Sequence, residues 1–199
     1  MDVNNNGKLD DANWVDTVWR EGMLELLKNT REILGNEKII MVNSSSYGAN
    51  YINGRLYESW PDEWGGGWKG QMKDYQNLEK NIKHIPQVVV LNPNTNNTGI
   101  NNNYAQVRFG LSSTLQGNGY FAFDWGTQDH SQLWRYDEYE IDLGYPNSQS
   151  REIKPGVLRR DFTKGVVLVN STAQAQEIDL GPGIYQKING FQDLSLIHI

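Results

Sequence analysis

The sequence predicts an α/β fold, in which a parallel sheet with helices between its strands is followed by a small antiparallel β domain. In residues 1–150, stretches with a helical apolar period alternate three times with short, continuous apolar runs. This order builds parallel sheets through right-handed crossovers. After Gly156, short runs of strand length follow one another with only turn residues between them, which is typical of antiparallel sheets.

The first predicted helix spans residues 14–34, where apolar side chains recur with a 3.6-residue period and Gly35 follows as a stop signal. The apolar face of this amphipathic helix consists of Val15, Val18, Trp19, Met23, Leu26, Leu27, Ile33 and Leu34. Residues 38–43 (KIIMVN) form a continuous apolar run, as in strands that are covered on both faces. The stretch that follows, up to Trp68, is rich in Gly, Tyr and Trp and is expected to be a long loop.

Two further pairs of a helix and a strand complete the predicted parallel sheet. A weaker helical period covers residues 69–84 and precedes a second apolar run at 87–92 (QVVVLN). A third helical period covers residues 104–115 and precedes a glycine turn and the run 120–125 (YFAFDW). The sequence therefore predicts three strands in this sheet.

The antiparallel domain is predicted over residues 156–193. Its expected strands are 157–162, 165–170, 176–180 and 184–188, with turns of Gly, Pro, Ser and Thr between them. About four strands close neither a sandwich nor a barrel, so we expect this domain to be incomplete.

Charge and composition exclude some classes of function. The chain of 199 residues has a net charge of −6 and scattered basic residues, so it offers no basic stripe to nucleic acid. The sequence has no run of about 18 apolar residues, the length that a membrane-spanning helix needs. Without Cys it forms neither disulfides nor Cys-based zinc sites. Seven Trp, ten Tyr and many Asn residues suit a sugar-binding cleft.

The active site of a parallel α/β fold lies at the carboxyl ends of its strands, and this rule selects a few polar residues. Asn43 ends the first predicted strand, Glu58 lies in the loop that follows, and Asp124 closes the third strand. Glu58 and Asp124 both have aromatic neighbours, and two carboxyl groups across a cleft are what glycosidic hydrolysis requires. They are the predicted catalytic pair, with the roles of acid and base left open. The alternatives are a solvated loop glutamate and an aspartate that accepts hydrogen bonds from nearby backbone.

Further side chains near the same strand ends are predicted to bind substrate. They are Tyr57, Trp60, Trp64, Asn92, Trp125, His130, Asp137 and Glu138. Trp60 and Trp64 lie in a stretch rich in Gly and Pro that suits an exposed sugar platform, although aromatic residues also suit a core. For Asp137 and Glu138 the alternative is a structural ion pair or a helix cap, and for His130 it is an ordinary hydrogen-bonded loop position.

The N-terminal segment has the spacing of a calcium-binding loop. Positions 1, 3, 5 and 9 of such a loop carry oxygen ligands, and position 6 is glycine. The corresponding side chains are Asp2, Asn4, Asn6 and Asp10. Asn13 stands where a bidentate Glu is expected, so the alternative is a turn of Asn, Asp and Gly before the first helix. No other cofactor is expected.

The segment from Arg108 to Pro146 (RFGLSSTLQGNGYFAFDWGTQDHSQLWRYDEYEIDLGYP), followed by RRDFTKGVVLVN, resembles the closing part of bacterial proteins of hypothetical glycoside hydrolase-like family 15. The likeness covers most of residues 1–190. It implies the C-terminal part of a (β/α)8 barrel, the TIM barrel, followed by a small β domain. The three predicted strands would then be the sixth to the eighth of the barrel. The resemblance does not identify the catalytic residues.

Under this resemblance the chain is expected to be a fragment of a longer protein from metagenomic sequence. Barrel hydrolases often carry one catalytic carboxylate after the fourth strand, which would precede Met1. Residues 194–199 (LSLIHI) resemble the translation of a sequencing adapter, with a real final strand as the alternative. We therefore expect the fragment to be inactive alone. A secreted or periplasmic location is inferred only from the class of substrate.

The sequence favours a glycoside hydrolase that acts on an oligo- or polysaccharide. Two alternatives stay open, namely a carbohydrate-binding barrel protein without activity, and a polysaccharide lyase or deacetylase. The lyase or deacetylase would need a metal or a basic catalyst, and three His residues, one of them in the adapter-like tail, argue against a His-rich zinc site.

Overall fold

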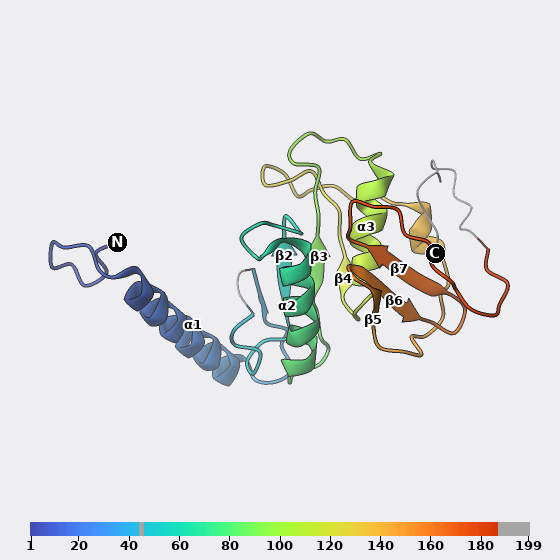
Figure 1. The fold of residues 1–199 in the computed structure, drawn as a ribbon. Helices are drawn as coiled ribbons and strands as arrows, with labels where there is room; N and C mark the ends of the chain where they lie inside the picture. The colour runs from blue at the N-terminus through green and yellow to red at the C-terminus, as the bar shows by residue number, and fades with distance from the viewer. Residues whose placement is uncertain (44–45, 187–199) are drawn as a thin grey trace.

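A computed structural model of the chain describes residues 1–43 and 46–186 (Figure 1). The elements in chain order are α1 (Ala12–Leu34), β1 (Met41–Val42), β2 (Gly54–Glu58), α2 (Gly67–Asn81), β3 (Val90–Asn92), α3 (Tyr104–Thr114), β4 (Tyr120–Phe121), the 3-10 helix η1 (Asp137–Glu140), β5 (Arg151–Lys154), β6 (Val157–Asp161) and β7 (Val166–Asn170). The adapter-like tail 194–199 and the end of the predicted strand 184–188 lie outside the described residues.

The larger sheet is parallel, with its strands in the order β1-β2-β3-β4. This confirms the predicted parallel α/β part, but the sheet has four strands where the sequence predicted three. The additional strand is β2, which lies within the predicted long loop. Its five residues, GRLYE, include two charged side chains and no continuous apolar run, so it lacked the signal of a buried strand. Glu58 therefore ends a strand and does not lie in a loop.

One face of this sheet packs against α2 and α3. Side chains alternate between the two faces of a strand, so Tyr57, Leu91 and Phe121 share the helix-covered face. Tyr57 makes an edge-to-face contact with Tyr75 of α2, and Phe121 lies against Gly110 of α3. The main core is built on this face and contains Leu27, Ile40, Ile52, Tyr57, Trp60, Met72, Tyr75, Leu78, Ile82, Val89 and Leu91.

The opposite face of the sheet carries apolar side chains that are only partly buried. Leu56, Val90 and Tyr120 are neighbours on this face through the strand register. Leu56 and Val90 are half-buried, whereas Tyr120 and Met41 are exposed. An apolar sheet face is normally covered by another layer or by closure of the sheet on itself.

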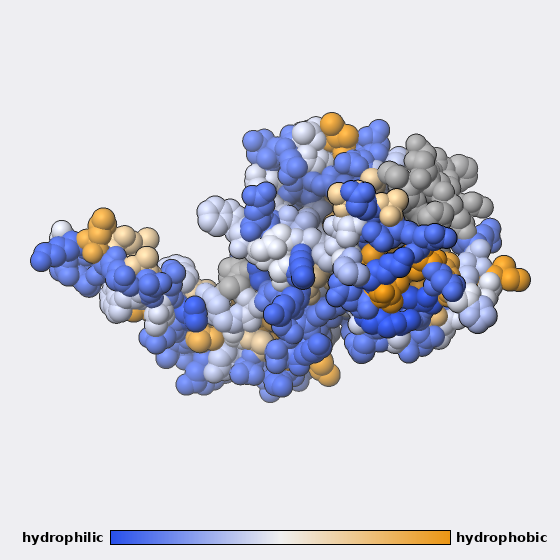
Figure 2. All heavy atoms as spheres, in the orientation of Figure 1, coloured by the Kyte–Doolittle hydropathy of each residue, from blue (hydrophilic) through white to orange (hydrophobic). Residues whose placement is uncertain are grey.

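The first helix projects from the rest of the structure (Figure 1), and apolar side chains are visible along it in Figure 2. The predicted helix is confirmed, but most of its apolar face, including Trp19 and Ile33, is exposed. Only its C-terminal half packs against the rest of the described structure. There Leu27 and Arg31 are buried, and the Arg31 guanidinium donates to the carbonyls of Gly35, Lys38 and Tyr51 and to Oδ1 of Asn53. In the part of the chain that the structure describes, no helix is both long and apolar enough to cross a membrane.

The second sheet is antiparallel, in the order β5-β6-β7, which confirms a separate β part after the parallel sheet. It begins at Arg151, before the predicted start at Gly156, because β5 forms a hairpin with β6 around that glycine. Gly156 has a φ of +75°, a conformation that suits glycine in such a turn. The predicted strand 176–180 is wrong, since these residues have no regular structure.

A buried arginine links the two sheets. Arg160 of β6 is 3% exposed, and its guanidinium donates to the carbonyl of Gly117, the carbonyls of Leu115 and Ser148 (3.1 and 3.2 Å) and Oδ1 of Asn118 (2.6 Å). Three of these four acceptors follow α3, so the side chain fastens the end of that helix to the antiparallel sheet.

Replacing this arginine should destabilise the protein. Arg160→Leu removes every donor of the guanidinium group and leaves the buried oxygens that accept from it without a hydrogen bond. We therefore expect the free energy of unfolding, measured by urea denaturation, to fall by about 2–4 kcal/mol. Arg151→Leu is the matched control, because Arg151 pairs with Asp161 through a half-exposed side chain and should cost at most about 1 kcal/mol. Equal losses for the two variants would contradict the linking role of Arg160.

Candidate active site at the carboxyl edge of the parallel sheet

The carboxyl ends of β2, β3 and β4 bring three polar residues to one edge and one face of the sheet. Glu58 ends β2 and is paired in register with Asn92, which ends β3. Beyond β4, Asp124 forms a parallel bridge with Asn94. Because side chains alternate, Glu58 and Asp124 both lie on the face opposite to the helices. The predicted pair thus shares one end of the sheet.

A histidine connects these two carboxylates. His130 Nδ1 lies 2.6 Å from Oδ2 of Asp124, a hydrogen-bond distance, and its Nε2 lies 3.7 Å from Oε1 of Glu58. The imidazole is 51% exposed, so it stands at the mouth of the site. The sequence placed His130 after the last strand of the sheet, but nothing in the pattern indicated that it would bridge the pair.

The surrounding carboxylates favour the protonated form of His130. Its pKa is raised above the ordinary value, mainly by the hydrogen bond to Asp124, with smaller contributions from the charges of Asp124, Glu58 and Asp129. Partial loss of solvent acts in the opposite direction and is outweighed. The site therefore combines two acids with a base that gains positive charge more readily than a free imidazole.

The two carboxylates have different surroundings. The side chain of Asp124 is 10% exposed, and its Oδ1 is buried without a hydrogen-bond partner among the described residues. The side chain of Glu58 is 30% exposed, and its Oε2 accepts a hydrogen bond of 2.7 Å from Nδ2 of Asn43. The strand-end rule selected Asn43 in the sequence, but it was assigned neither a catalytic nor a substrate-binding role.

The loop after β3 forms a wall of the site beside Asp124. The backbone N–H of Thr95 donates to the carbonyl of Asp124, and the N–H of Asn97 donates to the carbonyl of Trp125. The ring of Trp125 lies so close to Gly99 that a side chain there would collide with it. Glycine at position 99 thus lets the Asn-rich loop pack directly on a tryptophan next to the candidate acid.

Two of the predicted aromatic ligands are core residues. Tyr57 is buried on the helix side of the sheet, where its hydroxyl donates to Oδ2 of Asp74. Trp60 is 2% exposed and packs against Phe109, so it offers no exposed platform. The sequence placed both in a long loop, because neither strand β2, which contains Tyr57, nor the packed turn after it, which contains Trp60, was predicted. Trp64 is fully exposed, as a platform requires.

The remaining predicted ligands are partly structural. The carbonyl of Asn92 accepts from the N–H of Trp60, and the residue is buried beside Glu58. Glu138 is buried and forms an ion pair of 2.5 Å with Arg108 of α3, which matches the structural alternative. Asp137 begins η1. A role of these three residues in substrate binding stays a prediction.

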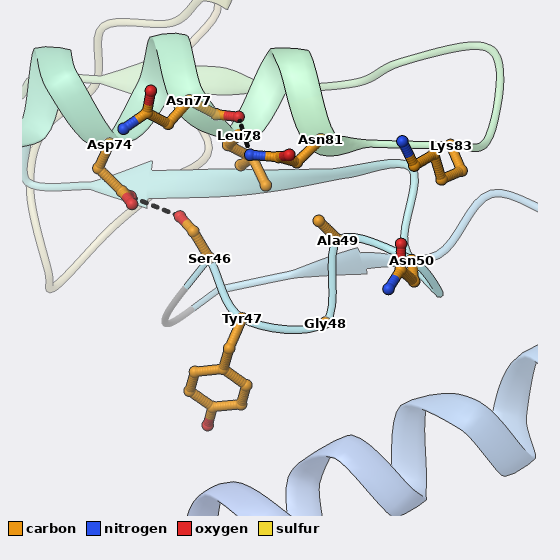
Figure 3. A pocket seen from close by; sticks show the side chains of 10 residues that line it. All are labelled: Ser46, Tyr47, Gly48, Ala49, Asn50, Asp74, Asn77, Leu78, Asn81 and Lys83. Atoms are coloured by element: carbon orange, nitrogen blue, oxygen red, sulfur yellow. Dashed lines mark hydrogen bonds between the residues drawn. The ribbon is translucent and has the colours of Figure 1, made fainter.

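A hollow of about 590 Å³ lies away from this site, between the loop 46–50 and the C-terminal half of α2 (Figure 3). At its edge Asp74 accepts hydrogen bonds from Ser46, Arg55 and Tyr57. This network lies on the helix-covered face of β2 and clamps α2 to the strand. None of the predicted site residues lines the hollow.

The N-terminal loop is closed by its own hydrogen bonds. Both oxygens of Asp2 accept from the backbone N–H groups of Asn6 and Gly7, and Asp10 accepts from Val3 and Asn4. Asparagine and aspartate turns are held together in this way. Within residues 1–43 and 46–186, no group of three or more His, Cys, Asp and Glu side chains is arranged to hold a metal ion. Calcium binding to this loop stays a prediction.

A protein-family model described as hypothetical glycosyl hydrolase family 15 matches residues 1–166. The match covers the whole parallel sheet, the candidate site and the start of the antiparallel sheet. None of the curated proteins compared with the chain matches it.

The bridge between His130 and Asp124 can be tested by NMR. We expect the imidazole of His130 to titrate above the ordinary histidine value, and Asp124→Asn to lower its midpoint, because the variant removes the carboxylate that favours the protonated ring. The signal is assigned by its loss in His130→Gln. The measurement is the ring proton chemical shift against pH, and Asp142→Asn, remote from the site, is the control that should leave the midpoint unchanged. A midpoint that Asp124→Asn does not move would contradict the bridge.

Proposed function

We propose that this chain, which belongs to hypothetical glycosyl hydrolase family 15, hydrolyses glycosidic bonds with Glu58 and Asp124 as its pair of carboxylates. The observation that carries the proposal is the approach of both side chains to one imidazole at the carboxyl edge of the sheet. Parallel α/β folds use this edge for catalysis. The family description supports the class of reaction, and the geometry supports the choice of residues.

We also propose that the parallel sheet is part of the wall of a (β/α)8 barrel. Two features of the sheet support this. Among the described residues, strands β1 and β4 each pair with a neighbour on one side only. The helix-free face carries the partly exposed Leu56, Val90 and Tyr120. In a closed barrel such inward-facing side chains form the packed interior, and the strand ends surround the active site.

The reaction needs one carboxyl group to protonate the leaving oxygen and the other to attack the anomeric carbon or to activate water. Because Glu58 and Asp124 each approach one nitrogen of the same ring, their nearest oxygens lie at most about 9 Å apart, within the range that glycosidases use. This bound is compatible with both retaining and inverting hydrolysis.

The proposed substrate is an oligo- or polysaccharide. Exposed Trp64, the Trp125 ring and the Asn-rich loop 92–103 offer the flat apolar faces and amide groups that bind sugars. A polymer of this kind is met outside the cytoplasm, and we propose a secreted or periplasmic location on that ground.

The test of the proposal is loss of hydrolysis when either carboxylate is neutralised. The protein, expressed at its natural length, is assayed on a panel of aryl glycosides and polysaccharides. We expect Glu58→Gln and Asp124→Asn each to lower kcat/KM by about 10²–10⁴-fold on unactivated substrates, because each removes a group that acts in the transition state. Glu63→Gln, which alters an exposed acid of the neighbouring loop, is the matched control and should change kcat/KM less than about threefold.

Other outcomes would identify the alternatives. Unchanged hydrolysis in both carboxylate variants would contradict the assignment of this pair. Glycan binding by a wild type that cleaves nothing would favour a carbohydrate-binding protein. Release of unsaturated sugars or of acetate would indicate a lyase or a deacetylase.

A further inference from the structure

We infer that His130 is a positioning residue that holds Asp124, through a short hydrogen bond, as the base or nucleophile of the pair, which leaves Glu58 as the proton donor. The inference rests on the proposed glycosidase function. It adds a division of roles that the sequence left open.

The first argument is the contact between His130 and Asp124. A hydrogen bond of 2.6 Å from Nδ1 to Oδ2 is short for N–H···O and has the length of a charge-assisted bond. A donor of this kind stabilises the carboxylate form of its acceptor. Glu58 lies 3.7 Å from the same ring, and among the described residues its hydrogen-bond partner is the neutral amide of Asn43. Of the two acids, Asp124 therefore receives the stronger support for negative charge.

The second argument is the unused oxygen of Asp124. With Oδ2 occupied by His130, Oδ1 is buried and has no hydrogen-bond partner in the described part of the chain. A buried acceptor without a partner is rare in proteins and calls for an explanation such as a catalytic role. Oδ1 is thus shielded from water while Oδ2 is held by His130, so the carboxylate is fixed in one orientation.

The third argument is that Glu58 is better placed to exchange a proton. Its side chain is more exposed than that of Asp124, at 30% against 10%. When protonated, Glu58 transfers its proton to the glycosidic oxygen as the bond from that oxygen to the anomeric carbon breaks, and the bonding electrons stay on the oxygen. Asp124 then gives an electron pair to the anomeric carbon, or takes a proton from the water that attacks it.

The charged groups facing His130 are Asp124, Glu58 and Asp129. Asp129 is exposed on the turn before His130, and its carboxylate accepts from the N–H of Ser131. Its contribution to the protonation of the ring is the smallest of the three. The pH response of His130 is therefore governed by the catalytic pair.

Leaving-group dependence tests the division of roles. The protein at its natural length is assayed with a 2,4-dinitrophenyl glycoside, whose leaving group departs without a proton, and with an alkyl glycoside of the same sugar. Glu58→Gln should lose less than about tenfold in kcat/KM on the dinitrophenyl substrate but more than about 10³-fold on the alkyl one. Asp124→Asn should lose more than about 10³-fold on both.

The role of His130 itself is tested by the pH profile of kcat/KM. The pKa of His130 is raised, so the ring is more fully protonated at pH 5 than at pH 7, and the protonated ring is the charge-assisted donor to Asp124. His130→Ala removes this donor, so its loss relative to wild type should be at least about twofold greater at pH 5 than at pH 7. His130→Gln retains a neutral N–H donor and should restore part of the activity at pH 7. His84→Gln is the control, since His84 contacts only the carbonyl of Asn50 in a remote loop, and its profile should match wild type.

The outcomes separate the inference from the function on which it rests. A wild type that cleaves none of the glycosides overturns the proposed function and the inference with it. An active wild type in which Asp124→Asn spares the dinitrophenyl substrate, or in which His130→Ala loses activity equally at pH 5 and pH 7, overturns the inference alone.

Discussion

Parallel pairing of β2 with β3, and of β3 with β4, sorts the side chains of this protein into two groups. The register places Tyr57, Leu91 and Phe121 on the face that α2 and α3 cover, and it places Glu58, Asn92 and Asp124 on the other. Since the strands run in the same direction, the carboxyl ends of all of them lie at one edge. Packing on one face and chemistry on the other both follow from this register.

The buried charged residues around the parallel sheet differ in how fully they are hydrogen-bonded. Arg31, Arg108 and Arg160 use their guanidinium groups to join segments that are distant in sequence, and each meets fixed carbonyl, amide or carboxylate acceptors. Oδ2 of Asp124 is paired with His130, and its Oδ1 is buried without a partner among the described residues. Burying a polar atom without a partner costs stability, and Nε of Arg55 and Nε1 of Trp60 share this state, so it is the contact with His130 that distinguishes the candidate site from the structural contacts.

Much of the fold could be predicted from periodicity, because α1, α2 and α3 each carry a clear helical pattern. Strand β2 could not, since Arg55 and Glu58 interrupt its apolar character and their partners, Asp74 and Asn43, lie elsewhere in the chain. The same gap in the prediction led to Tyr57 and Trp60 being interpreted as ligands. The burial of Tyr57 depends on the face of β2 that it occupies, and the burial of Trp60 depends on how the turn after β2 packs against Phe109.

The candidate site was predicted in part. Glu58 and Asp124 were selected by their positions near strand ends, and the structure brings both to His130. The bridge itself depends on the path of residues 125–130, where a turn returns the chain over the sheet edge. No spacing rule in the sequence predicts that path. The buried ion pair of Arg108 with Glu138 could not be predicted for the same reason, because it joins residues that are distant in sequence.

The central claim is that Glu58 and Asp124 act together in one reaction. The most direct test is a double-mutant cycle on kcat/KM for an unactivated glycoside, with Glu58→Gln, Asp124→Asn and the double variant in the protein at its natural length. If the two carboxylates work as a unit, the double variant should be slower than the slower single variant by less than about tenfold. Losses that multiply in full would contradict the claim, since they would mean that the two side chains act independently.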